Sequence, residues 1–284
     1  MSLRFKTIPR PGRLARWVGL YTLVAAAIAF ATLPVYWMLV TAMQRGPELY
    51  VWPPHRLPNL GEIAVFYRLF ATQPISRWLF NSAIVGCGTA SLSVALSILG
   101  AYSLSRFRYW GRNTFGFLLL LTQMLPSAVL IVPLFIIFKE THLLNTRLGL
   151  ILADTAVIAP ITVWILKTFF DTIPEEIEEA GLMDGCSRLG VLRRITLPLS
   201  APALVAAFAI GFFEAWNEFV FALTFVSDQS LWVTSVGLAS WIGYLTTPVE
   251  IMMSGAVVFT LPSILLFLAL QRQLISGLAA GGIR

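Results

Sequence analysis

The chain contains the sequence EAGLMDG at residues 179–185, followed after nine further residues by ITLP at residues 195–198. Both pieces lie between two long apolar segments, and many of the residues around them are charged. A short polar stretch of this kind inside a strongly apolar chain connects two membrane-spanning segments. It is therefore a candidate site where a soluble partner binds the membrane protein.

The composition excludes an ordinary soluble domain. Hydrophobic residues make up 57% of the 284 residues and charged residues only 12%, whereas soluble domains carry about 25% charged residues. A helix needs about 20 apolar residues to cross the hydrocarbon core, because its backbone polar groups must be paired within the segment. Barrel-type strands of alternating polarity are absent. The predicted fold is all-α, a polytopic membrane protein with six transmembrane helices over residues 17–43, 79–105, 114–138, 148–166, 199–226 and 251–271.

The basic residues predict the orientation of these segments. Most of the 20 Lys and Arg residues precede the first segment, follow the second and the sixth, or flank the connection between the fourth and the fifth. Since short cytoplasmic loops are enriched in Lys and Arg, both termini are predicted to be cytoplasmic. The same rule accounts for the net charge of +6 without a nucleic-acid partner. The expected parts are a basic segment (1–16), a six-helix domain (17–272) with its polar connection (171–198), and a C-terminal tail (273–284).

The chain carries no recognisable catalytic or metal-binding constellation. It has no phosphate-binding loop, and its two histidines, His55 and His142, fall in separate predicted external loops. Cys87 lies in a predicted span and Cys186 in a cytoplasmic loop, so no disulfide is indicated. We therefore expect no enzyme activity, metal or cofactor in this chain. Any chemistry that powers it must come from a partner.

The polar connection is predicted to form a helix, a sharp turn and a second helix. Thr172 and Glu175 have the spacing of a capping box, and Pro174 suits a first helical turn. Gly185 can take the left-handed conformation that ends a helix, and Ser187 can cap the next one.

The first of these helices carries a face of small residues. Ile177, Ala180, Gly181 and Asp184 share this face, which would let another surface approach closely. A hairpin that only joins two spans at the membrane surface has the same pattern, so the pattern leaves both interpretations open.

The spacing resembles the EAA motif in permease subunits of ATP-binding-cassette (ABC) importers. That motif reads Glu-Ala-Ala, three residues, Gly, nine residues, Ile, one residue, Leu-Pro. The matching residues are Glu179, Ala180, Gly185, Ile195, Leu197 and Pro198, and Gly181 replaces the second Ala.

The wider chain is similar to one branch of that family, the carbohydrate-uptake permeases of the maltose-transporter inner-subunit type. The similar strings are AYSLSRF at 101–107, LNT at 144–146, WNEF at 216–219, QR at 271–272 and GL at 277–278.

The resemblance implies a type I ABC importer permease in a bacterial or archaeal cytoplasmic membrane, surrounded by lipid. It implies a second, homologous permease, two cytoplasmic ATPase subunits that hold ATP and Mg, and an extracytoplasmic sugar-binding protein. The polar connection would then hold the coupling helix, which docks on one ATPase. The residues implied in this coupling are Glu178, Glu179, Ala180, Gly181, Met183, Asp184, Gly185, Ile195, Leu197 and Pro198.

Two further groups of residues are candidates for contacts with the solute or its carrier. Glu214, Asn217 and Glu218 are predicted on one face of the fifth helix, where they either line the translocation path or join helices by hydrogen bonds. Trp232, Trp241 and Tyr244 lie in a loop on the external side. They either contact the binding protein or form an interfacial aromatic belt.

Two rival functions remain open at this level. The coupling motif alone also fits an ABC importer for a non-sugar solute. A stand-alone channel or secondary transporter would require matched broken helices or inverted repeats. Prolines at 34, 126, 133 and 262 interrupt three segments, but no inverted repeat is visible.

Overall fold

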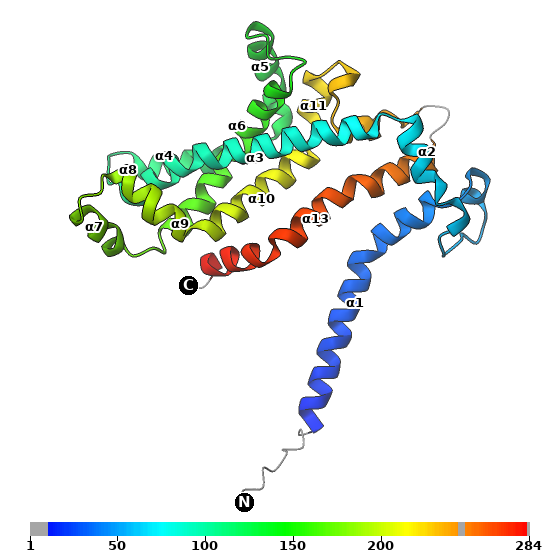
Figure 1. The fold of residues 1–284 in the computed structure, drawn as a ribbon, viewed down its shortest axis with the longest axis horizontal. Helices are drawn as coiled ribbons and strands as arrows, with labels where there is room; N and C mark the ends of the chain where they lie inside the picture. Colours follow the sequence, from blue (N-terminus) through cyan, green and yellow to red (C-terminus); the bar gives the residue numbers. More distant parts are fainter. Residues whose placement is uncertain (1–10, 244–247, 283–284) are drawn as a thin grey trace, which may run out of the picture. The chain divides into compact units, whose positions relative to one another are not determined.

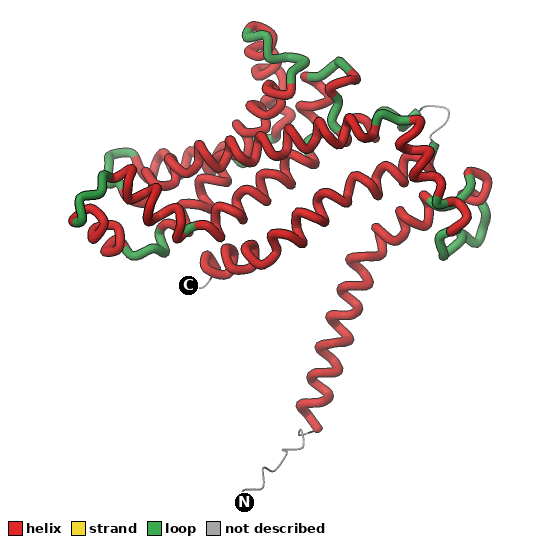
Figure 2. The backbone as a smooth tube through the Cα atoms, viewed as in Figure 1, coloured by secondary structure: helices red, strands yellow, loops and turns green. Residues whose placement is uncertain are grey.

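The computed structural model describes residues 11–243 and 248–282, which are mostly helical and contain no strand (Figures 1 and 2). The chain divides into two compact units, Met1–Leu69 with Pro248–Val257, and Phe70–Thr247 with Val258–Arg284. The α-helices are α1 Pro11–Ala42, α2 Ala64–Thr72, α3 Ile75–Arg106, α4 Arg112–Thr122, α5 Ser127–Glu140, α6 Arg147–Phe170, α7 Glu175–Met183, α8 Arg188–Val191, α9 Leu197–Leu199, α10 Ala201–Asn217, α11 Val220–Phe225, α12 Thr234–Ala239 and α13 Val249–Gly282. Short helical turns are η1 Gly46–Tyr50, η2 Leu60–Glu62, η3 Leu192–Thr196 and η4 Gln229–Leu231.

Four helices within the described residues are long and apolar enough to cross a membrane, namely α1, α3, α6 and α13. Two further pairs of helices meet the same test only when each pair is taken together. One pair is α4 with α5, bent by 99°, and the other joins Arg188–Leu199 to α10, bent by 79°. The predicted third segment, 114–138, is therefore bent within its length. The predicted fifth, 199–226, begins at the second bend and is interrupted between α10 and α11.

Proline accounts for the position of the first bend. Pro126 precedes α5 with extended backbone, and a proline disfavours helical geometry in the residue before it. The Gln123 side chain, in the gap between the two helices, donates a hydrogen bond of 2.9 Å to the Val157 carbonyl of α6. The bend is thus attached to a neighbouring helix.

The larger unit is built on α3, α6 and α10, which pack through small residues. Ser93 Oγ donates to Thr162 Oγ1 at 3.0 Å, and Ser97 Oγ donates to the Ala159 carbonyl at 3.1 Å. Gly211 of α10 lies against Ala90 of α3, where even an added Cβ would come within 3.4 Å of the Ala90 Cα. Because lipid gives helices no hydrophobic reason to associate, close packing and polar contacts of this kind hold membrane bundles together.

The smaller unit consists of α1, the following loop and the start of α13. Tyr36 donates from its hydroxyl to the Arg56 carbonyl at 2.6 Å, which ties the loop to α1. Arg45 Nε lies 2.6 Å from Glu62 Oε1, and this hydrogen bond raises the pKa of Arg45.

The start of α6 generates a stability test. Thr146 caps this helix by accepting from the Gly149 backbone N–H at 2.9 Å and donating to the Leu143 carbonyl at 2.7 Å. A Cβ on Gly149 would overlap the Leu143 carbonyl oxygen, and backbone cannot yield cheaply. We expect Gly149→Ala to lower the unfolding free energy by about 1–3 kcal/mol, seen as a lower Tm in detergent. Gly19→Ala is the matched control, because its Cβ would meet nothing within 4 Å. Equal Tm values for the two variants would contradict the packing described.

Candidate functional site

The polar connection folds as the predicted helical hairpin, with α7 first and α8 continuing into η3. Gly185 has φ +87°, the left-handed conformation expected at the end of a helix. Its N–H donates to the Leu182 carbonyl and the N–H of Cys186 donates to the Gly181 carbonyl, both at 3.0 Å. These two bonds form the helix-ending pattern in which glycine is favoured. Ser187 caps α8 by accepting from the Gly190 N–H at 3.1 Å, which confirms its predicted role.

The predicted capping box at the start of α7 is wrong. Thr172 does not cap the helix, because its hydroxyl donates to the Phe169 carbonyl at 2.7 Å. Pro174 occupies the N-cap position, just before the first turn, and no side chain caps α7 there.

Glu178 is the centre of the hairpin, and it is buried. Its Oε1 accepts from Arg106 Nε at 3.0 Å and from the Thr196 hydroxyl at 2.9 Å, and its Oε2 accepts from the Tyr102 hydroxyl at 3.0 Å. The Arg106 and Glu178 side chains are each only 6% exposed. One carboxylate therefore joins α7 to the end of α3 and to η3.

Arg106 completes this arrangement with bonds to the segment that precedes α7. Its Nη2 donates to the Phe170 and Ile173 carbonyls at 2.9 and 2.8 Å, and its Nη1 donates to Ser105 Oγ at 3.1 Å. Ser105 in turn donates to Asp171 at 2.6 Å. The guanidinium thus satisfies the carbonyls at the end of α6 while it neutralises Glu178. Sequence reasoning used Arg106 as a topology signal and as part of the AYSLSRF string, and missed this role.

The two sides of α7 have different surroundings. Gly181 faces inward, and a Cβ there would overlap Ile195 Cδ1 and touch Val191. Its predicted place on a docking face is therefore wrong. Glu178, predicted among the coupling residues, is 4% exposed and so forms no part of an exposed docking surface. Of the predicted coupling residues on α7 and at its C-terminal end, those that stay exposed are Glu179, Ala180, Met183, Asp184 and Gly185, with Met183 88% exposed. Ile177, predicted on the same face as Ala180, is also exposed. Beyond the turn, Ile195 and Leu197 are half-buried and Pro198 is exposed.

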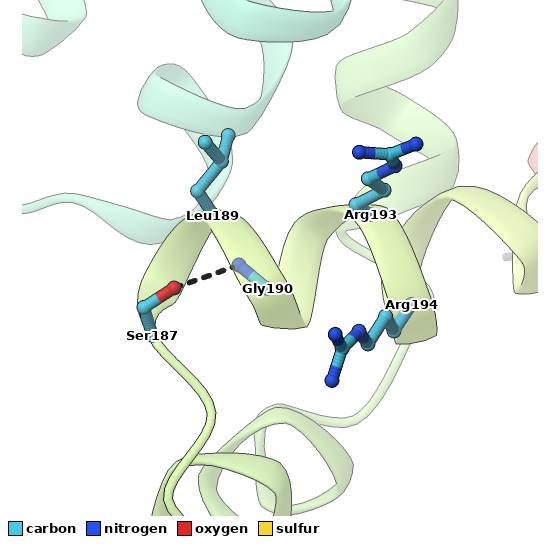
Figure 3. A pocket seen from close by; sticks show the side chains of 5 residues that line it. All are labelled: Ser187, Leu189, Gly190, Arg193 and Arg194. Atoms are coloured by element: carbon cyan, nitrogen blue, oxygen red, sulfur yellow. Dashed lines mark hydrogen bonds between the residues drawn. The ribbon is translucent and has the colours of Figure 1, made fainter.

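A hollow of about 490 Å³ lies on the second half of the hairpin (Figure 3). It is lined by Ser187, Leu189, Gly190, Arg193 and Arg194, and the two arginine side chains extend from η3 in different directions (Figure 3). Leu189 is 67% exposed, so an apolar side chain and two cations share this open surface.

The residues predicted to line a path are separated by the end of α10. Glu214 and Asn217 are exposed on α10, while Trp216 is buried against Phe212 and Phe259. Glu218 follows the helix with extended backbone (ψ 135°). The prediction that Glu214 and Glu218 share one helix face is therefore wrong.

The Glu218 carboxylate instead holds the start of α11. It accepts from the backbone N–H groups of Phe221 at 2.7 Å and Ala222 at 3.0 Å. The first N–H groups of a helix have no intrahelical partner, so a carboxylate there is stabilising.

The predicted binding-protein residues pack around one tryptophan. Trp232 and Trp241 lie with ring centroids 6.3 and 5.5 Å from Trp78, which is 3% exposed. Trp241 Nε1 donates to Gln73 at 3.1 Å. Tyr244 lies outside the described residues.

Two asparagines fix the loop that contains Trp232. Asn81 donates to the Ser230 and Trp232 carbonyls at 3.0 and 2.9 Å. The Asn145 side-chain oxygen accepts from the N–H groups of Ser227 at 2.6 Å and Asp228 at 3.1 Å. Sequence reasoning missed both asparagines as fixing points, although Asn145 belongs to one of the strings that carried the resemblance.

The buried ion pair generates a second test. We expect Arg106→Met and Glu178→Met to destabilise the protein by about 3–5 kcal/mol each, because each leaves the other charge buried without its partner. The double variant should be more stable than either single variant. The measurement is a double-mutant cycle of thermal unfolding in detergent, with Glu179→Gln as the exposed neighbouring control. Additive losses in the double variant would show that the two side chains are not coupled.

Comparison with known proteins shows the family to which this chain belongs. The model of the binding-protein-dependent transport system inner membrane component matches residues 93–279. The sulfoquinovosyl glycerol transport system permease protein SmoH of Agrobacterium fabrum is 34% identical over 263 residues, which cover 92% of each chain. The trehalose/maltose transport system permease protein MalG of Thermococcus litoralis is 32% identical over 266 residues, 92% of this chain and 96% of that one.

A solved structure agrees with this assignment at the level of fold. A chain of a bacterial ABC transporter involved in import of the acidic polysaccharide alginate superposes with a TM-score of 0.75 at 18% identity, covering 94% of this chain and 99% of that chain. The chain thus belongs to the family of binding-protein-dependent transport system inner membrane components, whose members are transport permeases rather than enzymes.

Proposed function

We propose that this chain is the permease subunit of an ATP-driven, binding-protein-dependent sugar importer. The names of its relatives support a sugar, since they include transport systems for sulfoquinovosyl glycerol, trehalose and maltose, and diacetylchitobiose. In this proposal the chain spans a bacterial cytoplasmic membrane six times with both termini inside. The helices α4 with α5 make one bent span, and α10 with α11 make the fifth span, over the predicted segment 199–226.

The partners follow from the same proposal. A second, homologous permease completes the translocation path, two ATPase subunits bind ATP and Mg on the cytoplasmic side, and a sugar-binding protein docks outside. A solved alginate transporter in complex with its oligosaccharide-bound periplasmic protein, similar to this chain with a TM-score of 0.63, supports a partner of this last kind.

The observation that carries the coupling role is the anchoring of α7 by Glu178 and Arg106. A docked helix moves the bundle with it only if its attachment to the bundle is stiff. Glu178 is bonded to α3 and η3 at once, and its three partners lie within 3.0 Å. Movement of an ATPase against the exposed side of α7 would therefore displace α3 and η3 together.

The exposed Glu214 on α10 supports a position for the translocation path beside this helix. Glu214 is exposed on a helix that is otherwise strongly apolar, with Asn217 three residues further on. A carboxylate in a membrane is costly when it faces lipid and is usually directed to a water-filled cavity or a partner protein. Glu214 and Asn217 accordingly face the translocation path between the two permeases, and Glu218 stabilises the adjoining helix. Trp232 and Trp241 shape the external surface for the binding protein around Trp78.

Reconstitution tests the proposal. The chain is combined with its partner permease, ATPase pair and binding protein in liposomes, and ATP hydrolysis is recorded across a panel of sugars, amino acids and phosphate. One sugar should stimulate hydrolysis and enter the liposomes. Stimulation only by a non-sugar solute would contradict the sugar assignment, and uptake without any ATPase would contradict the whole proposal.

A variant pair in the same liposomes tests the coupling surface. Ala180 is exposed on α7, so Ala180→Trp should abolish uptake by blocking close approach of the ATPase while leaving the Tm unchanged. Ala180→Ser keeps a small side chain and should transport normally. Full uptake by the Trp variant would mean that this side of α7 carries no partner.

A further inference from the structure

A second cavity, of about 250 Å³, lies between α4 and the last turns of α6. Its walls combine cationic and apolar side chains. Arg112 begins α4 and Lys167 lies in the last turn of α6, and both line the cavity. Leu104 and Phe117 provide apolar walls, and Trp164 also lines the cavity, with Lys167 Nζ 5.5 Å from its ring centroid.

One buried hydrogen-bond donor belongs to Trp164, a residue that lines this cavity. The indole Nε1 of Trp164 is buried and finds no acceptor among the residues that the structure describes. Such a donor costs free energy unless a ligand or water accepts its hydrogen bond. A ligand that carries an acceptor oxygen would remove that cost.

The charge of the cavity is positive. Lys167 Nζ lies 2.6 Å from Asp171 Oδ2, an exposed i,i+4 pair, so that carboxylate offsets one of the two cations. The other cation, Arg112, has a hydrogen bond of only 3.4 Å to the Phe107 carbonyl. Arg112 also lines the adjoining hollow with Arg108, which adds a further positive charge. The matching ligand is therefore an anion with several acceptor oxygens, such as a phosphodiester.

The apolar side of the cavity favours a ligand with a hydrocarbon part. Phe117 is 59% exposed and Leu120 39% exposed, so an apolar surface continues from the cations along α4. The cavity also lies at the ends of α3 and α6, two helices of membrane-spanning length, where lipid headgroups reside. Basic pockets between membrane helices are suited to anionic lipid headgroups.

We propose that this cavity binds the phosphodiester headgroup of an anionic phospholipid, with its acyl chains against Phe117 and Leu120. Arg112 and Lys167 neutralise the phosphate, and Trp164 Nε1 donates to one of its oxygens. A bound lipid would thereby link α4 to α6 beside the Lys167 and Asp171 pair.

Native mass spectrometry of the full chain tests this site with phosphatidylglycerol, phosphatidylcholine and inorganic phosphate as separate probes. Phosphatidylglycerol should remain bound when equal phosphatidylcholine competes. Arg112→Gln and Trp164→Phe should each reduce its retention, the first by about tenfold because a charge-assisted hydrogen bond is lost. Arg193→Gln is the matched control, because it removes an exposed arginine from the other hollow and should bind like the parent.

Three results would overturn the proposal. One is equal retention of the neutral and the anionic lipid. Another is unchanged binding in both Arg112→Gln and Trp164→Phe, with Tm values that show intact folds. The third is full displacement of the lipid by millimolar inorganic phosphate, which would identify a simple anion site.

Discussion

The buried ion pair between Arg106 and Glu178 is the contact on which the functional interpretation depends. Removing two charges from water is costly, and a buried pair is tolerated only when its remaining hydrogen-bonding groups are also satisfied. Here the carboxylate has three partners and the guanidinium also binds the Phe170 and Ile173 carbonyls. The pair therefore fixes the direction in which the chain leaves α6 and the side of α7 that remains exposed.

Gly181, which replaces the second Ala of the motif, lies in an unexpected place. Gly181 lies on the inner side of α7, where a Cβ would overlap the end of the Ile195 side chain and touch Val191. The small residue thus lets the two halves of the hairpin approach closely, while Ala180 and Met183 lie on the exposed side, where we propose that a partner docks. The hairpin is compact because Gly181 faces inward, while the small Ala180 lies on the exposed side.

The turn of the hairpin was predictable from sequence, whereas the start of α7 and the long-range contacts were not. The left-handed Gly185 and the cap by Ser187 depend on residues within a few positions of each other. Glu178 and Arg106 are 72 residues apart, and no pattern in the chain pairs them before the helices are arranged. The bends were also not predictable, because a run of apolar residues predicts that a segment is long enough to cross a membrane but not whether its helix is straight. Glu218 shows the consequence, since it falls past the end of α10 and binds α11 instead of extending the polar face of Glu214.

Structures of the assembled transporter with and without ATP test most directly whether the hairpin moves with the bundle. We expect α7 to contact an ATPase through Ala180 and Met183 in both states, while Arg106 Nε and Glu178 Oε1 stay within hydrogen-bond distance. An α7 that touches no ATPase in either state, or an ion pair that breaks when the ATPases close, would contradict the claim that this hairpin moves as one body with the bundle.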